Sequence, residues 1–184
     1  MNGTESDYET LVRPIEDRMI RSVWRIVHDP DDAEDAFQEA LASVWKRLDR
    51  IRRHPNPHAL ILRICINSAY DILRRSARHR RHEELDAIPE DLPDPAPSAS
   101  DRLACREERA EILQTIGQLP RKQGEATLMR FVEELPYSDI AQALGCREVT
   151  ARKHVARARE KLSRLLAHLL PTSFKEVANH EPQR

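Results

Sequence analysis

The sequence is poor in the residues that build sheets and tight turns. Only 4% of its 184 residues are aromatic, and it has four glycines, whereas strands favour aromatic side chains and turns favour glycine. Its 40% of apolar residues is nevertheless enough for compact cores. We therefore expect an all-α fold with one ordinary domain or two small ones.

Cysteines and long apolar runs are also scarce. The three cysteines, Cys65, Cys105 and Cys146, are far apart and form no C-x-x-C pair, so neither a disulfide framework nor a zinc site is predicted. No apolar run approaches the roughly 20 residues that cross a bilayer, and the polar start MNGTESDYET lacks a signal-peptide pattern. These absences predict a cytoplasmic protein without membrane insertion.

Residue patterns typical of catalysis are missing as well. The chain has no Ser-His-Asp, Cys-His or metal-ligand constellation, and its glycines form neither a P-loop nor a dinucleotide-binding fingerprint. We expect a protein that binds rather than catalyses, with no cofactor, no metal and no small-molecule substrate.

The net charge of −1 hides blocks of opposite sign. From Lys46 to Arg81 there are eleven basic and two acidic residues, whereas from Glu83 to Asp101 there are seven acidic residues and no Lys or Arg. The acidic block contains IPEDLPDPAPSASD, whose four prolines break helical periodicity. We predict a linker over 83–102 between two helical bodies.

The first body is predicted to contain several helices. Apolar residues at helical spacing predict one helix from about Glu9 to His28. The segment DPDDAEDAFQEALASVWKRL begins with cap signals and with acids that suit a helix N-terminus, and its apolar stripe includes Trp45. After the break DRIRRHPNPH, a long helix is expected from about Pro57 to His82, because proline fits a first turn.

This long helix carries polar residues at steps of three or four along one face. They are Arg63, Asn67, Asp71, Arg74 and Arg78. A solvated, salt-bridged face is the plain structural explanation. Asn67 favours a nucleic-acid face, because an amide can pair with a base edge while neighbouring arginines contact phosphates.

The second body is predicted to contain a helix-turn-helix. In DIAQALGCREVTARKH, Gly145 permits a sharp turn after a short helix. Ala151, Val155 and Ala158 then form an apolar seam on the next helix, whose outer face is basic. Basic surface helices are common, but this arrangement is typical of a helix that enters the DNA major groove.

Together these segments resemble the extracytoplasmic-function (group 4) sigma factors of the sigma-70 family of bacterial RNA polymerase. The similarity extends over nearly all of 8–168 and rests on DPDDAEDAFQEALASVW, NPHALILRICINSAYDILRRSARHRR, LPRKQGEATLMRFVEELPYSDIAQALGC and VTARKHVARAREKL. It implies a sigma-2-like helical bundle over 1–82, the acidic linker, a sigma-4-like helix-turn-helix domain over 103–170 and a polar tail over 171–184. The implied function is that of an alternative sigma factor, which binds the polymerase core and directs promoter-specific initiation.

The resemblance assigns roles in the first domain. Asp35, Gln38 and Glu39 match the D-x-x-Q-E segment that docks on the clamp helices of the β′ subunit, although acids at a helix start are also explained by the helix dipole. Asn67 matches the residue that recognises an unpaired minus-10 base. The other minus-10 candidates are His54, Pro55 and Asn56, in a loop matching a flipped-base pocket, and Arg63, Asp71, Arg74, Arg75 and Arg78.

In the second domain the resemblance implies a minus-35 site. Its candidates are Arg130, Arg147, Glu148, Thr150, Arg152, Lys153, Ala156 and Arg157. Arg147 and Glu148 depart from the family pattern, as does Ala151 in place of the usual valine, and we expect these departures to alter base preference. Further expected partners are the β flap of the polymerase and an anti-sigma factor.

Other functions remain open from the residues alone. A stand-alone helix-turn-helix regulator would explain the second body but leaves the docking acids and the Asn67 face without a role. A sigma-like decoy that binds an anti-sigma factor would keep the fold but would not need DNA-reading residues. A recombinase with a helix-turn-helix would need a catalytic cluster that the sequence lacks.

Overall fold

The computed structural model describes residues 8–27, 29–83 and 97–169, which form helices and turns without a strand. In chain order the helices are η1 (Arg13–Ile15), α2 (Glu16–Ile26), α3 (Pro30–Lys46), α4 (Leu48–Arg52), α5 (Pro57–Glu83), α6 (Pro97–Gly117), α7 (Arg121–Phe131), α8 (Tyr137–Leu144) and α9 (Glu148–Leu165). The all-α prediction is confirmed for this part of the chain. The predicted tail and much of the predicted linker lie outside the described residues.

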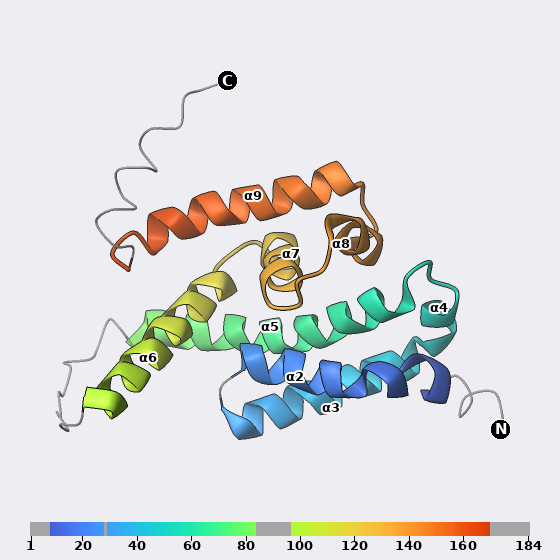
Figure 1. The fold of residues 1–184 in the computed structure, drawn as a ribbon, viewed down its shortest axis with the longest axis horizontal. Helices are drawn as coiled ribbons and strands as arrows, with labels where there is room; N and C mark the ends of the chain where they lie inside the picture. Colours follow the sequence, from blue (N-terminus) through green and yellow to red (C-terminus); the bar gives the residue numbers. More distant parts are fainter. Residues whose placement is uncertain (1–7, 28, 84–96, 170–184) are drawn as a thin grey trace.

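In the N-terminal body, α2 and α3 pack on one side of α5 (Figure 1). Its first segment departs from the single helix predicted from Glu9 to His28. The chain forms a helical turn at 8–11 and the 3-10 turn η1 before α2 begins at Glu16. Pro14 explains this interruption, because proline has no backbone N–H and its ring clashes with the preceding turn.

Helix α3 begins with the cap that its sequence predicts. The Asp29 carboxylate accepts hydrogen bonds from the backbone N–H groups of Asp31 and Asp32, each at 3.0 Å. The predicted inclusion of Trp45 in the apolar stripe is wrong. Trp45 is 44% exposed and stacks on Tyr8, with the two ring centroids 5.3 Å apart.

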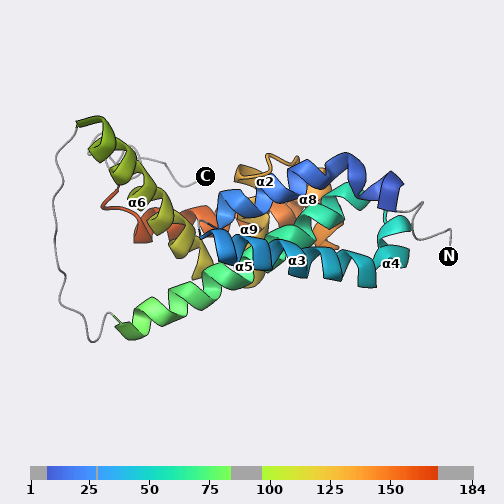
Figure 2. The ribbon, with the colours of Figure 1, turned by 90° about the horizontal axis from the view of Figure 1, so that it is seen from below.

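Helix α5 of the first body lies between α2 and α3 on one side and α7 and α8 on the other (Figure 1). Figure 2 shows the same helices from below. Helix α5 spans Pro57–Glu83, close to the predicted bounds. Several of its residues are no more than 1% exposed: Ile61, Leu62, Cys65, Ile66, Ala69 and Tyr70. Because a helix with apolar residues around most of its circumference must be covered on most sides, α2 and α3 bury one side and α7 and α8 another.

Helices α8 and α9 form the predicted helix-turn-helix. Gly145 ends α8 with a φ of 65°, the left-handed conformation that glycine adopts without a steric penalty. The Cys146 N–H donates to the Ala141 carbonyl at 2.9 Å and closes the turn. The predicted seam is buried, through Ile140, Ala141 and Leu144 on α8 and Ala151, Val155 and Ala158 on α9.

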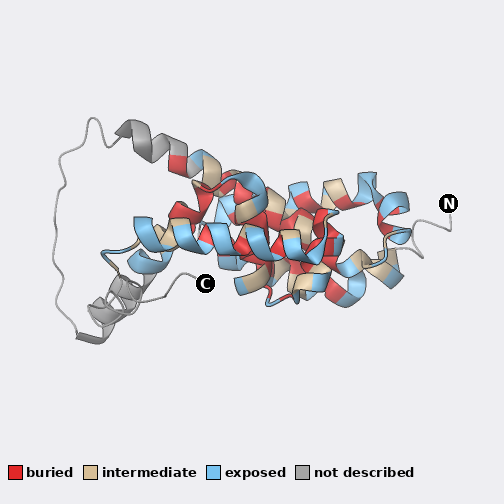
Figure 3. Cartoon of the chain, turned by 90° about the horizontal axis from the view of Figure 1, so that it is seen from above, coloured by how far each residue is buried: buried red, intermediate tan, exposed pale blue. Residues whose placement is uncertain are grey.

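The second body packs against the first. One cluster of buried apolar residues includes side chains from both bodies, and Figure 3 shows the buried residues gathered along the middle of the molecule.

Helix α6 begins at Pro97, inside the predicted linker, and proline is favourable in a first turn. Within the described ranges, no helix is long and apolar enough to cross a membrane.

Burial on α5 predicts the reactivity of one cysteine. Cys65 is 0% exposed, and burial raises the pKa of its thiol to about 12. Because the thiolate is the reactive form, we expect Cys65 to resist iodoacetamide at about pH 8 while the half-buried Cys146 reacts. Peptide mass spectrometry would measure both rates, and equal rates without denaturant would contradict this packing of α5.

Candidate nucleic-acid interface

The predicted minus-35 residues gather on the outer side of the helix-turn-helix. Six of them are exposed: Arg147, Glu148, Arg152, Lys153, Ala156 and Arg157. Thr150 is half-buried. Arg130 belongs to α7, and its Nη1 donates to the Leu135 carbonyl at 3.1 Å. The exposed residues of α9 lie opposite its buried seam, so the helix has one apolar and one largely basic side.

Tyr137 joins two arginines of this surface and was missed in the sequence. The guanidinium carbons of Arg152 and Arg130 lie 4.4 and 5.2 Å from the centre of its ring, within the range of cation–π attraction. Arg152 also donates from Nε and Nη2 to Glu148 Oε1, at 3.1 and 2.5 Å. The Arg152 guanidinium is therefore contacted by a ring and by a carboxylate, and the sequence signals were an aromatic residue at the start of α8 and a glutamate four residues before Arg152.

His154 is a half-buried residue of α9. Burial lowers the pKa of its imidazole, and the positive charges of Lys122 and Arg157 lower it further. Its Nδ1 is buried without a hydrogen-bond partner in the described part of the chain. His154 therefore contributes a neutral side chain to this basic surface at neutral pH.

The predicted polymerase-docking residues occupy one exposed side of α3. Asp35, Gln38 and Glu39 are all exposed, and residues spaced by three and four lie on the same side of a helix. The helix is buried on its opposite side against α5. The three side chains are thus brought together, as their spacing predicts.

The loop before α5 is partly structural. Asn56 Oδ1 accepts the Ala59 N–H at 3.0 Å, which caps the start of α5. His54 Nδ1 accepts the Asn56 N–H at 3.1 Å, and its Nε2 lies 3.2 Å from the Gln142 carbonyl of α8. Pro55 is exposed. Two of the three predicted pocket residues therefore also hold the loop in place.

The predicted DNA face of α5 is covered by the second body. Arg63 Nε donates to Glu125 Oε2 at 3.0 Å, and its Nη1 donates to the Ala143 carbonyl at 2.7 Å. Arg121 donates to both carboxylate oxygens of Asp71, at 2.9 and 3.1 Å. Two of the predicted minus-10 residues, Arg63 and Asp71, therefore pair with the second body in this structure, and their role at DNA stays a prediction.

Asn67 borders a small pocket between α4 and α5. The pocket has a volume of about 100 Å³ and is lined by Arg47, Arg50, Ile51, Leu60, Arg63, Ile64 and Asn67. Asn67 Oδ1 is buried and has no hydrogen-bond partner within the described ranges. An unpaired amide oxygen beside three arginines suits a polar ligand more than a purely structural role.

The remaining minus-10 candidates follow along α5. Arg74 is half-buried and Arg75 is exposed, so the two differ in their access to a phosphate. Arg78 belongs to α5 by its backbone, but its side chain lies outside the description.

The structure thus combines a helix-turn-helix whose second helix has an exposed basic side, a pocket lined by arginines and a helix with exposed acids. These are features expected of a helical DNA-binding protein with a protein partner. Two family models match the chain in the same order. Sigma-70 region 2 matches residues 11–79, and Sigma-70, region 4 matches residues 109–162. Together they cover more than half of the chain.

Curated relatives cover nearly the whole chain. The RNA polymerase sigma-H factor of Pseudomonas aeruginosa is 32% identical over 91% of this chain and 90% of its own. The RNA polymerase sigma-E factor of Streptomyces coelicolor is 30% identical over 99% of this chain and 97% of its own. Among solved structures, the sigma factor RpoE in complex with the anti-sigma factor NepR, from Bartonella quintana, shares the fold. Its TM-score is 0.51, with 24% identity over 88% of this chain and 97% of that chain.

The chain belongs to the sigma-70 family, in its extracytoplasmic-function class. It is a non-enzymatic transcription initiation factor that binds RNA polymerase core and promoter DNA and directs promoter-specific initiation.

Proposed function

We propose that this sigma factor reads the two promoter elements with separate bodies. Residues 1–82 dock on the polymerase and read the minus-10 element, and 103–170 read the minus-35 element. The main support for two separate roles is that the chain has two separate sites. One is the exposed basic side of α9 after the Gly145 turn, and the other is the pocket that Asn67 lines. The two sites also lie in the two matched regions, 4 and 2.

In the minus-35 complex, α9 enters the major groove. Arg152 is the principal base contact, because an oriented guanidinium can bond a guanine edge through two donors. Lys153, Ala156 and Arg157 lie beside it along the groove, and Arg130 contacts the DNA backbone. Arg147, Glu148 and Thr150 meet the DNA at the start of α9, where they tune base preference.

Docking on the polymerase occurs through α3. Asp35, Gln38 and Glu39 bind the β′ clamp helices, and the second body binds the β flap. These contacts occur in the cytoplasm, where the polymerase works. An anti-sigma factor is a further partner, supported by the shared fold of a relative solved in complex with one.

At the minus-10 element, the pocket between α4 and α5 receives an unpaired base. His54, Pro55 and Asn56 precede α5 and form one edge of this site in the complex. The amide of Asn67, which lines the pocket and whose oxygen has no hydrogen-bond partner among the described residues, recognises the base. Extruding a base costs a few kcal/mol, and this amide offsets part of that cost. The neighbouring charged residues Arg63, Asp71, Arg74, Arg75 and Arg78 follow the DNA strand.

We expect Asn67→Ala to impair promoter opening with little change in binding to closed duplex DNA. The variant removes the amide that recognises the unpaired base, at a cost of roughly 1–3 kcal/mol for one base contact. Permanganate footprinting of the melted strand would measure opening. His58→Ala, an exposed change in the first turn of α5, is the control. Unaltered melting and start-site use in the Asn67 variant would remove its assigned role.

A further inference from the structure

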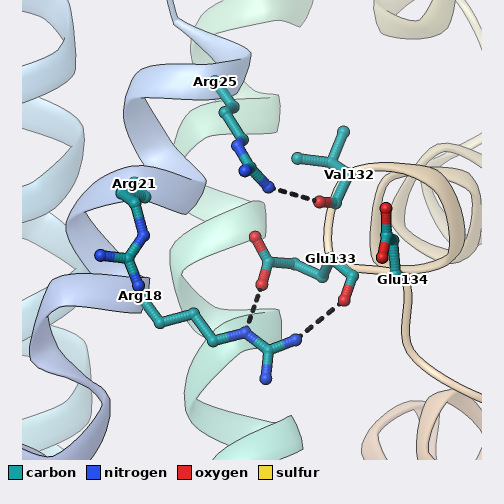
Figure 4. A pocket seen from close by; sticks show the side chains of 6 residues that line it. All are labelled: Arg18, Arg21, Arg25, Val132, Glu133 and Glu134. Carbon is teal, nitrogen blue, oxygen red and sulfur yellow. Dashed lines mark hydrogen bonds and ion pairs between the residues drawn. The ribbon is translucent and has the colours of Figure 1, made fainter.

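Two hollows border the second body, and they differ in how their polar groups are paired. The first lies between α2 and the turn after α7, as Figure 4 shows. There Arg18 donates to the carboxylate and to the carbonyl of Glu133, each at 2.8 Å, and Arg25 donates to the Val132 carbonyl at 3.1 Å. Much of the hydrogen-bonding capacity of this hollow is therefore satisfied within the chain.

The second hollow is an apolar groove of about 280 Å³ between α6, α7 and the end of α9. Phe131 lines it and is 61% exposed. Thr127 also lines it, and its buried hydroxyl has no hydrogen-bond partner among the described residues. An exposed apolar wall and an unpaired buried hydroxyl indicate that a covering element is missing. We refer to this hollow as the α6–α9 groove, whose lining includes Ile112, Thr127, Phe131, Arg159, Leu162 and Leu166.

The chain leaves α9 beside this groove. Leu166, the first residue after α9, lines the groove, and its carbonyl accepts the Leu169 N–H at 3.0 Å. His168 Nε2 lies 2.7 Å from Glu111 Oε1 of α6. These contacts hold the last described turn against α6, so residue 170 follows directly beside the groove.

The segment that follows has the sequence pattern of a short amphipathic helix. In PTSFKEVANHEPQR, Ser173 and Glu176 match the capping box S-x-x-E, which is typical of a helix start. Phe174, Val177 and Ala178 are spaced by three and four residues, so they would share one face of such a helix. The segment can therefore offer one small apolar face, with a single large aromatic side chain.

Reach and charge also suit this segment to the groove. Residues 170–172 span roughly 10 Å when extended, so Phe174 can reach the groove beside which α9 ends. Arg159 is the charged residue of the groove lining and is exposed, whereas residues 173–181 carry two glutamates and one lysine. The groove and the segment are thus complementary in charge as well as in apolar character.

We propose that the α6–α9 groove is the docking site of the chain's own residues 173–178, with Phe174 as the side chain that fills it. The docked segment covers Phe131 and Leu162. Because a segment tethered by a short linker has an effective concentration of the order of millimolar, it holds the groove against free apolar ligands. This inference goes beyond the proposed function, since none of the DNA contacts proposed above lies in this groove.

A photo-crosslink at position 174 of the full-length chain tests where the segment lies. Phe174 is replaced by p-benzoylphenylalanine, a mixture of isotopically light and heavy chains is irradiated, and the cross-linked peptides are identified by mass spectrometry. We expect cross-links within one chain to residues 112–116, 127–131 and 159–166, and few of them from the same group placed at Gln183. Cross-links spread evenly over the surface, or joining light to heavy chains, would overturn the proposal.

Binding of the same segment as a free peptide measures how far the groove is occupied. A fluorescein-labelled peptide of residues 170–184 is titrated with full-length chains and followed by fluorescence anisotropy. We expect Phe174→Ala to bind the peptide about tenfold or more tightly than the wild type, because occupancy of a site lowers its apparent affinity in proportion. Lys175→Ala, a neighbouring change off the apolar face, should bind the peptide as weakly as the wild type.

Phe131→Ala tests whether the peptide binds in this groove. Added to Phe174→Ala, it should remove the gain in peptide affinity, because it takes away an exposed wall of the groove. Val149→Ala, at a comparably exposed apolar residue near the start of α9, should leave the gain intact. Equal peptide binding by the wild type and Phe174→Ala, or a gain that survives Phe131→Ala, would overturn the proposal.

Discussion

The double variant Asp35→Lys, Glu39→Lys should lose promoter-specific transcription because it no longer forms a holoenzyme. Both carboxylates are exposed on one side of α3, so their replacement should leave the core of the body intact. A surface that docks through acids meets a basic partner, and like charges placed opposite one another cost several kcal/mol. We expect a loss in core affinity of more than about 100-fold, equivalent to roughly 3 kcal/mol.

Binding of the labelled sigma factor to purified core would measure this loss by fluorescence anisotropy. The matched control is Glu107→Lys, Glu108→Lys, which makes the same change of charge at two exposed residues of α6. It should bind core normally. If the α3 variant bound core with wild-type affinity, the proposed docking role of these acids would be wrong. Their role would then be limited to a favourable interaction with the helix dipole.

Replacement of Arg152 by alanine should weaken minus-35 binding and leave core affinity unchanged. A good base contact contributes roughly 1–3 kcal/mol, or about 5- to 150-fold in affinity. The exposed pairing with Glu148 contributes little to folding, so the variant should be as stable as the wild type. Titration of holoenzyme on promoter fragments with intact and scrambled minus-35 elements would measure the effect.

The control for Arg152 lies on the same helix. Arg164 is 73% exposed and also pairs with a glutamate four residues away, Glu160. Arg164→Ala should therefore lose the same charge without losing base recognition. If Arg152→Ala lost core binding instead, or kept full preference for the intact minus-35 element, the assignment of α9 to the major groove would be wrong.

The helix-turn-helix could be predicted from local sequence because its determinants are local. Gly145 marked the left-handed turn, and the seam residues of α9 recurred at helical spacing and are buried. The bounds of α5 were equally readable from Pro57 and the apolar pattern. The break at Pro14 runs against the apolar periodicity around it, because the missing backbone donor of proline outweighs that pattern.

The contact between the bodies could not be read from periodicity. Arg63 and Asp71 are spaced as they would be on a solvated or DNA-binding face, and their partners Glu125 and Arg121 lie more than 45 residues further along the chain. Their pairing depends on long-range packing. Gly124 was the available signal, since a glycine inside an amphipathic helix often marks a close approach of another backbone or ring.

The most direct test of the account is run-off transcription with purified core polymerase on genomic fragments. The account predicts discrete promoter-specific transcripts that disappear with Asp35→Lys, Glu39→Lys and depend on Arg152 through the minus-35 element. Absence of promoter-specific transcripts with the wild-type chain, under conditions in which a control sigma factor is active, would contradict it.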